Sequence, residues 1–175
     1  MTPVPIRIAG ASDATALATV HVRSWQAAYR GLVPAAYLDG LDVAERAAVW
    51  RDRLSSADAP TVLVATSEAG TVRAFASFRA WPGGELDPAV TAELSALYAA
   101  PEVWGRGVGR ALLGATVAAM GAAGFREAAL WVLEGNGRAR AFYEAAGWLP
   151  DGVSAVEETG GLPLRELRYT CGPFS

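Results

Sequence analysis

Apolar and polar residues alternate in seven short runs of this 175-residue chain, and such alternation predicts β-strands. The predicted strands lie at residues 5–10, 61–67, 72–81, 92–100 and 126–134 and in the two halves of 154–170. A short segment with Gly70 separates the second and third runs, and Gly160-Gly161 separates the last two. Both pairs are therefore predicted to form hairpins.

Four other segments carry apolar residues at helical spacing. The predicted helices lie at residues 13–31, 35–54 with an interruption near Gly40, 104–123 and 138–147. The last of them ends at Gly147, a residue type that commonly follows a helix C-terminus. The order of strands and helices predicts one α/β (α+β) domain over residues 1–175, with a mixed sheet.

Composition excludes several kinds of site. With 52% hydrophobic residues the chain is typical of compact globular proteins, and its net charge of -3 argues against nucleic-acid binding. Cys171 is the only cysteine and His21 the only histidine, so a disulfide framework, a thiolate cluster or a His-rich metal site is not expected. The N-terminal sequence does not resemble a signal peptide, and no apolar run is long enough for a membrane span. We therefore expect a cytoplasmic protein without a metal.

The segment "GRGVGR" at residues 105–110 opens the third predicted helix. A dinucleotide-binding fingerprint fits it poorly, because Arg110 stands where that pattern needs glycine, and a Walker A loop fails because no Gly-Lys-Ser/Thr follows. What remains is a row of backbone N–H groups at a helix N-terminus beside Arg106 and Arg110, in a window (103–125) with no acidic residue. This combination favours a small polyanion such as a pyrophosphate.

Two blocks of sequence resemble the GNAT superfamily of acetyl-CoA-dependent N-acetyltransferases. The stretch "ELSALYAAPEVWGRGVGRALL" is similar to the family's strand followed by an R/Q-x-x-G-x-G/A loop, and "NGRARAFYEAAGW" is similar to its N-x-x-A-x-x-F-Y-x-x-x-G-F block. Together they cover residues 93–148. The resemblance implies the GNAT fold, a mixed and mostly antiparallel central sheet of about seven strands flanked by about four helices. Trp104 departs from the family pattern, which has Arg or Gln there, so that side-chain contact is expected to be missing, with Arg106 and Arg110 supplying charge instead.

The resemblance also implies how acetyl-CoA is held. The pantetheine arm is expected beside the strand at 93–99, and the pyrophosphate on the amides of the glycine loop. The cofactor-binding residues implied in this way are Leu97, Tyr98, Ala99, Gly105, Arg106, Gly107, Val108, Gly109, Arg110, Asn136 and Tyr143. Two alternatives stay open from the residues alone: Asn136 as the cap of the following helix, and Tyr143 as a core aromatic residue.

Acetyl transfer to an amine requires two proton movements. An alkylammonium is unprotonated in roughly one molecule in two thousand at pH 7, so a base must remove its proton, and the departing thiolate benefits from a proton donor. Glu93, at the start of the cofactor strand, is the candidate base, and Tyr143 the candidate acid. Glu93 as an ordinary strand-edge carboxylate, and His21 as the base, are the alternatives.

The remaining expectations concern the acceptor. Trp25 and Tyr29 lie on one face of the first helix with His21, and with Glu93 they are the predicted substrate pocket; packing of that face into the core is the alternative. We predict direct attack of a small-molecule or peptide primary amine in a ternary complex, because Cys171 lies outside both blocks. A noncatalytic acyl-CoA-binding module is the alternative, and the apolar C-terminal strands are candidates for pairing in a homodimer. Four acidic residues are expected near the mouth: Glu85, Asp87, Glu157 and Glu158.

Overall fold

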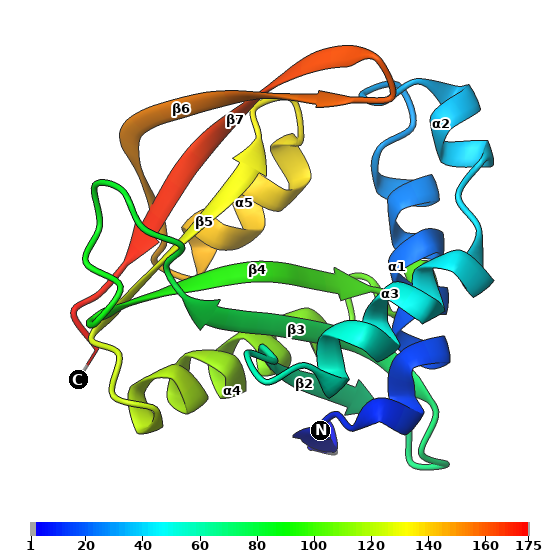
Figure 1. The fold of residues 1–175 in the computed structure, drawn as a ribbon, viewed down its shortest axis with the longest axis horizontal. Helices are drawn as coiled ribbons and strands as arrows, with labels where there is room; N and C mark the ends of the chain where they lie inside the picture. The colour runs from blue at the N-terminus through cyan, green and yellow to red at the C-terminus, as the bar shows by residue number, and fades with distance from the viewer. Residues whose placement is uncertain (1–2, 175) are drawn as a thin grey trace.

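The computed structural model describes residues 3–174, which form one seven-stranded sheet in the order β1-β2-β3-β4-β5-β7-β6 (Figure 1). The strands are β1 Ile6–Ile8, β2 Thr61–Thr66, β3 Val72–Ala80, β4 Thr91–Ala99, β5 Glu127–Leu133, β6 Leu149–Thr159 and β7 Leu162–Cys171. Neighbouring strands are antiparallel except β4 and β5, which are parallel. The predicted mixed, mostly antiparallel sheet is confirmed.

Five α-helices, rather than about four, occur within residues 3–174. They are α1 Ala14–Ala28, α2 Ala35–Asp39, α3 Val43–Ser55, α4 Val108–Ala122 and α5 Gly137–Ala145. The extra one arises because the helix predicted at 35–54 is divided at the interruption near Gly40. Asp42 begins a new helix there, since its side chain accepts a hydrogen bond from the Glu45 backbone N–H at 2.8 Å.

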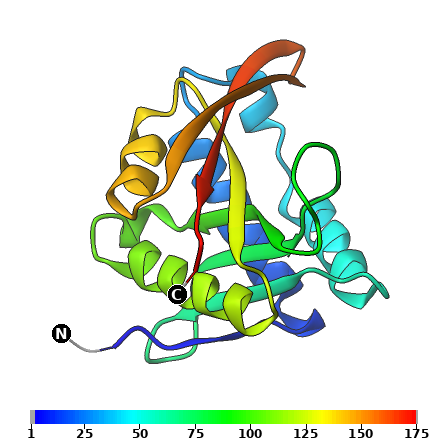
Figure 2. The ribbon, with the colours of Figure 1, turned by 90° about the vertical axis from the view of Figure 1, so that its left-hand side faces the viewer.

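Alternate residues of β3 enter two separate apolar cores. Ala74, Ala76 and Phe78 pack with α4 on one face of the sheet, whereas Phe75 packs with α1 and α3 on the other. Figure 2 shows α4 and α3 on opposite sides of these strands. The sheet is therefore covered on both faces, which explains the long apolar runs of β2 and β3.

The parallel strands β4 and β5 pair over only three residues and then diverge. Thr91 lies opposite Glu127 and Glu93 opposite Ala129, and no pairing continues beyond that point in the described chain. Strand β4 goes on pairing with β3 as far as Ala99, with a bulge near Ser95. The edge of β4 that faces β5 consequently has free backbone groups, and Figure 1 shows the two strands opening as a V toward α1.

The β6–β7 hairpin extends from the far side of this V to α2 (Figure 1). Its turn at Gly160 requires glycine, because φ is +61° there and a Cβ would lie 2.7 Å from Tyr37 Cβ on α2. The contact places the hairpin over the open end of the V.

In the described part of the chain, no helix is both long and apolar enough to cross a bilayer.

Candidate functional site

A cavity of about 510 Å³ lies where β4 and β5 diverge. It extends from the segment that precedes α4, past β4, β5 and α5, to α1 and the β6–β7 hairpin. We call one end the loop end, made by Gly105, Gly107, Gly109, Arg110, Asn136 and Arg138. We call the other the aromatic end, made by Trp25, Tyr29, Thr159, Leu164 and Glu166. Between them, the wall includes Glu93, Leu97, Tyr98, Ala99, Phe142 and Tyr143.

The loop end depends on backbone conformations that favour glycine. Gly105 and Gly107 have φ of +72° and +81°, and Gly107 directly precedes α4. The first intrahelical hydrogen bond runs from the Ala111 N–H to the Gly107 carbonyl. The backbone N–H groups before Ala111 therefore have no partner within the helix, and they carry its positive dipole end. Gly109 instead has helical geometry and lies against the Phe142 ring.

Trp104 fastens this loop to β4. Its indole Nε1–H donates a hydrogen bond to the Ala99 carbonyl at 2.8 Å. The guanidinium of Arg138, on α5, lies 4.0 Å from the centre of the Trp104 ring, within the range of a cation–π interaction. The tryptophan therefore brings Arg138 to the loop end. Sequence reasoning overlooked Arg138, although it stands two residues after Asn136 in the second block.

Two of the residues predicted to hold the cofactor lie outside the wall. Arg106 is exposed and does not line the cavity, and Val108 packs against the core under α4. The positive charges that do line the loop end belong to Arg110 and Arg138. Of the two arginines predicted to supply charge beside Trp104, Arg110 lines the cavity and Arg106 does not.

Asn136 caps α5 and also lines the cavity, so the two interpretations of this residue, helix cap and cofactor neighbour, are compatible. Its side-chain oxygen accepts a hydrogen bond from the Ala139 N–H at 3.1 Å, which caps α5, and the same residue lines the cavity. The cap fixes the asparagine at the loop end.

Tyr143 likewise belongs to both the core and the cavity wall. It is 9% exposed and packs with Phe142 and Trp148, and its hydroxyl has no hydrogen-bond partner among residues 3–174. Burial, and secondarily Tyr98, raises the pKa of its phenol well above the ordinary value. The hydroxyl therefore remains protonated at neutral pH, as a proton donor must be.

Glu93 lines the cavity near the vertex of the V and forms an ion pair. The Arg79 Nε–H donates to its Oε2 at 2.6 Å, and the glutamate side chain is 12% exposed against 56% for the arginine. Within residues 3–174 its other oxygen, Oε1, has no hydrogen-bond partner. That oxygen is free to accept a proton or a water.

The aromatic end contains two of the predicted pocket residues, Trp25 and Tyr29. Their rings are nearly perpendicular, with centres 4.8 Å apart, and burial is the main cause that raises the pKa of Tyr29. The Trp25 Nε1–H is buried without a partner in the described structure. Glu166, on β7, adds a carboxylate that sequence reasoning missed. In the sequence, Glu166 is marked only as a charged residue within the last predicted strand. The structure shows that Leu164 and Arg168, two positions away on either side, are also shielded from solvent.

His21 lies behind this wall and not in it. It stacks on Tyr98 with ring centres 4.8 Å apart and accepts a hydrogen bond from Trp50 Nε1 at 3.4 Å on Nδ1. Burial, with the charges of Arg46 and Arg53 adding to it, lowers its pKa to about 3. A neutral, enclosed imidazole of this kind supports the aromatic end mechanically and is a poor candidate for the base.

The four acidic residues expected near the mouth lie outside the wall. Glu85 and Asp87 lie in the loop between β3 and β4, where Glu85 bonds Arg168 at 3.3 Å and Asp87 accepts from the Ala89 N–H. Glu157 and Glu158 are exposed on β6.

A family model described as "Acetyltransferase (GNAT) family" matches residues 22–148, which include both ends of the glycine loop and α5. The chain belongs to this family. A relative in Bacillus subtilis (strain 168), described as the uncharacterized N-acetyltransferase YuaI, is 33% identical over 165 residues, covering 94% of this chain and 90% of YuaI. The protein is accordingly an acetyltransferase enzyme.

Solved structures confirm the GNAT fold. The PaiA N-acetyltransferase from Thermoplasma acidophilum, in complex with coenzyme A, has a TM-score of 0.72 and 23% identity, covering 95% of this chain and 98% of its own. A phosphinothricin acetyltransferase from Sinorhizobium meliloti, in complex with acetyl-CoA, has a TM-score of 0.72 and 22% identity, covering 98% and 89%.

Proposed function

We propose that this enzyme transfers the acetyl group of acetyl-CoA to a primary amine by direct attack in a ternary complex. The observation that carries the proposal is one continuous cavity. It joins a helix N-terminus that suits a pyrophosphate to a protonated Tyr143 and a carboxylate, Glu93.

The loop end suits the phosphates of acetyl-CoA. The backbone N–H groups of Gly105 and of Gly107 to Arg110, together with the Arg110 and Arg138 guanidiniums, offer hydrogen bonds and positive charge to a pyrophosphate, whereas the Arg106 N–H already donates to the Val103 carbonyl at 3.3 Å. The edge of β4 at Leu97–Ala99, which has no strand partner on this side, offers backbone groups to the pantetheine arm, which would lie there as an additional strand in the V. The Ala99 carbonyl is the exception, because it already accepts a hydrogen bond from Trp104. Asn136 and Tyr143 border the path of that arm.

The chemistry then requires two groups. Glu93 accepts, through water, one proton of the ammonium, and the amine lone pair attacks the thioester carbonyl. The tetrahedral intermediate collapses with cleavage of the C–S bond, and Tyr143 donates its proton to the thiolate. The remaining extra proton of the amide nitrogen passes through water to the Tyr143 phenolate, which restores the phenol, while Glu93 keeps the first proton until it is released to solvent. Cys171 is unsuited to an acyl-enzyme route, because it pairs with Ala128 at the end of β7 away from the cavity wall, and burial raises its thiol pKa.

A screen of primary amines that measures CoA release tests the proposal, with acetyl-, propionyl- and succinyl-CoA compared as donors. We expect release that depends on both the amine and acetyl-CoA. The alternative, a noncatalytic acyl-CoA-binding module, predicts that acetyl-CoA binds in a titration while no amine releases CoA. Membership of an enzyme family, and the presence of both Glu93 and Tyr143 on the wall, favour catalysis.

A further inference from the structure

Glu166 lies on the inner face of the β6–β7 hairpin, at the aromatic end. It is on the strand between β5 and β6, opposite Leu133 on one side and Ala155 on the other. Leu164, two residues earlier and therefore on the same face, also lines the cavity. Glu166 is only partly exposed, yet it takes part in no ion pair and no side-chain hydrogen bond within residues 3–174.

The charges around Glu166 leave it without a counter-ion. Four charged side chains line the cavity: Glu93, Arg110, Arg138 and Glu166. The two arginines are at the loop end, and Glu93 is neutralised by Arg79 at 2.6 Å. Burial raises the pKa of Glu166, and the charge of Glu157 on β6 raises it further. A cationic ligand beside Glu166 would favour its ionised form and so oppose both causes of the raised pKa.

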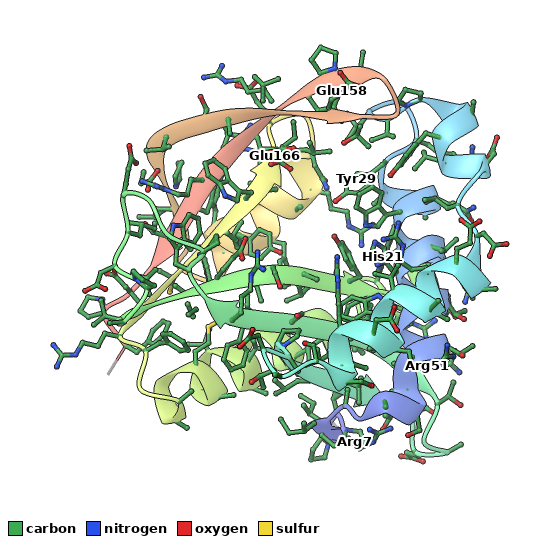
Figure 3. All side chains as sticks on the ribbon, in the orientation of Figure 1. Arg7, His21, Tyr29, Arg51, Glu158 and Glu166 are labelled. Atoms are coloured by element: carbon green, nitrogen blue, oxygen red, sulfur yellow. The ribbon has the colours of Figure 1, made fainter. Side chains whose placement is uncertain are left out.

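Aromatic side chains face this carboxylate from α1. Figure 3 shows Tyr29, which directly follows α1, and Glu166, on β7, and both residues line the cavity. Burial is the main cause that raises the pKa of Tyr29, and Tyr98, Tyr143 and Glu166 raise it further, so Tyr29 is close enough to Glu166 to feel its charge. Tyrosine and tryptophan faces attract ammonium groups, and a nearby carboxylate adds a charge-assisted hydrogen bond.

Glu166 is too far from Glu93 for both to hold one ammonium. Glu93 lies opposite Ala129 of β5, and Glu166 lies opposite Leu133 on the other side of the same strand. The four-residue difference corresponds to about 13 Å along β5 at about 3.3 Å per residue. The two carboxylates therefore define two separate positions for positive charge.

We propose that the aromatic end binds a second ammonium group of the acceptor, held by Glu166 and the rings of Trp25 and Tyr29. The preferred acceptors are then diamines, or other amines with a second cationic group several bonds from the reacting nitrogen. This proposal rests on the proposed function, since the first amine is the one that Glu93 and Tyr143 serve.

The test compares straight-chain diamines of four to eight methylenes with n-alkylamines of matched length. In the wild type we expect kcat/KM to be about 10- to 100-fold higher for the best diamine, the range for one charge-assisted hydrogen bond in a partly buried site. Glu166→Gln should remove that preference by raising KM for the diamine much more than KM for the monoamine of matched length. Glu158→Gln, an exposed carboxylate on the same hairpin outside the wall, is the matched control and should keep the preference.

A wild type without diamine preference would overturn the proposal, as would a Glu166→Gln variant that slows both amine classes equally. Calorimetric titration of the diamine into CoA-loaded protein separates this proposal from the proposed function. Diamine binding that is lost in Glu166→Gln would support the subsite even if no amine released CoA, whereas no binding to either protein would refute it. Thermal unfolding of each variant checks that the fold is intact, and Glu166→Asp should recover part of the diamine affinity.

Discussion

The loop end of the cavity is made largely of backbone groups, whereas the aromatic end is made of side chains. At the loop end, glycines and a helix N-terminus present N–H groups that any sequence carries, and two arginines add charge. At the aromatic end, recognition depends on the particular side chains of Trp25, Tyr29 and Glu166. The loop end comes from two short segments, residues 105–110 and 136–138, while the aromatic end joins the C-terminal part of α1 to a hairpin near the C-terminus.

This difference teaches which ligand each end suits. Backbone amides recognise an anionic group and tolerate changes in the surrounding side chains, so they suit the part of the reaction that stays constant. A pocket of specific aromatic and acidic side chains suits a partner selected among many. The groups between the ends, Glu93 and Tyr143, must act whichever acceptor is bound. Substitutions at the centre should therefore affect every acceptor, and substitutions at each end only one ligand.

The largest effect is expected at the centre, from Tyr143→Phe. The change removes only the hydroxyl, so kcat should fall by about 10²- to 10⁴-fold while KM for acetyl-CoA stays within a few-fold. The defect should shrink with acyl donors whose leaving thiols are more acidic, because their thiolates need a proton less. Tyr169→Phe, which removes a buried hydroxyl that bonds Glu144 away from the cavity, is the control and should leave kcat unchanged. An equal defect across the donor series would mean that Tyr143 is not the acid.

Glu93→Gln should lower the rate at neutral pH by a similar factor, about 10²- to 10⁴-fold. Much of the activity should return at high pH, where the amine loses its proton unaided. The measurement is a pH–rate profile of both proteins. Glu102→Gln removes an exposed carboxylate that pairs with Arg23 and serves as the control for the loss of an ion pair. If Glu93→Gln keeps the wild-type profile, another group is the base.

Acidification should lower the free energy of unfolding through His21, which packs behind the aromatic end. The folded-state pKa is about 3 and the ordinary value is 6.5, so the unfolded chain binds the proton first. This contribution to stability is complete above pH 6.5 and is lost as the pH falls from 6.5 toward 3. At pH 5 the loss is about 2 kcal/mol.

Urea unfolding of the wild type and of His21→Phe at pH 7 and pH 5 measures this loss. The variant, which keeps an aromatic ring of similar size against Tyr98 and Trp25, should be less sensitive to pH by about that amount. Asp13 and Glu102 have lowered pKa values and contribute at a more acidic pH than the interval compared. Equal pH dependence in both proteins would contradict the buried, neutral His21.

Gly107→Ala should impair the loop end alone. An alanine with φ near +81° is strained by about 1–2 kcal/mol, so the loop should relax away from its binding conformation and CoA affinity should fall about 5- to 30-fold. Gly114→Ala is the matched control, because Gly114 is an exposed residue inside α4 with open space around it. Calorimetric titration with CoA measures both. Unchanged affinity in a folded Gly107→Ala protein would contradict the assignment of the glycine loop as the CoA pyrophosphate site.

The smallest effect is expected from Trp104→Phe. Phenylalanine keeps a ring for Arg138 but loses the hydrogen bond to the Ala99 carbonyl, so CoA affinity should fall about 2- to 10-fold. The same titration of Arg138→Gln separates the two roles of Trp104, which are the hydrogen bond to the Ala99 carbonyl and the contact with the Arg138 guanidinium. A normal affinity in both variants would show that this contact is dispensable for CoA binding.

Much of the fold was predictable because it depends on local patterns. Strand alternation and helical spacing predicted all seven strands and the order of the elements, although β6 begins at Leu149 and not near residue 154. The resemblance of two sequence blocks to the GNAT family brought the glycine loop, Asn136 and Tyr143 to one expected site, and all three line the cavity. The interruption predicted near Gly40 divides 35–54 into two helices, because the Asp42 side chain caps the N-terminus of the second one. These features follow from residues near one another in the chain, so the sequence by itself determined them.

The tertiary structure decided what distant residues do together. The ion pair of Glu93 with Arg79, the Arg138 guanidinium over Trp104 and the exclusion of His21 from the wall all depend on how the sheet and helices pack. Glu166 gains significance only because β4 and β5 diverge and the hairpin turns it toward α1. Burial and charge are properties of a site's three-dimensional surroundings, and no spacing along the chain records them.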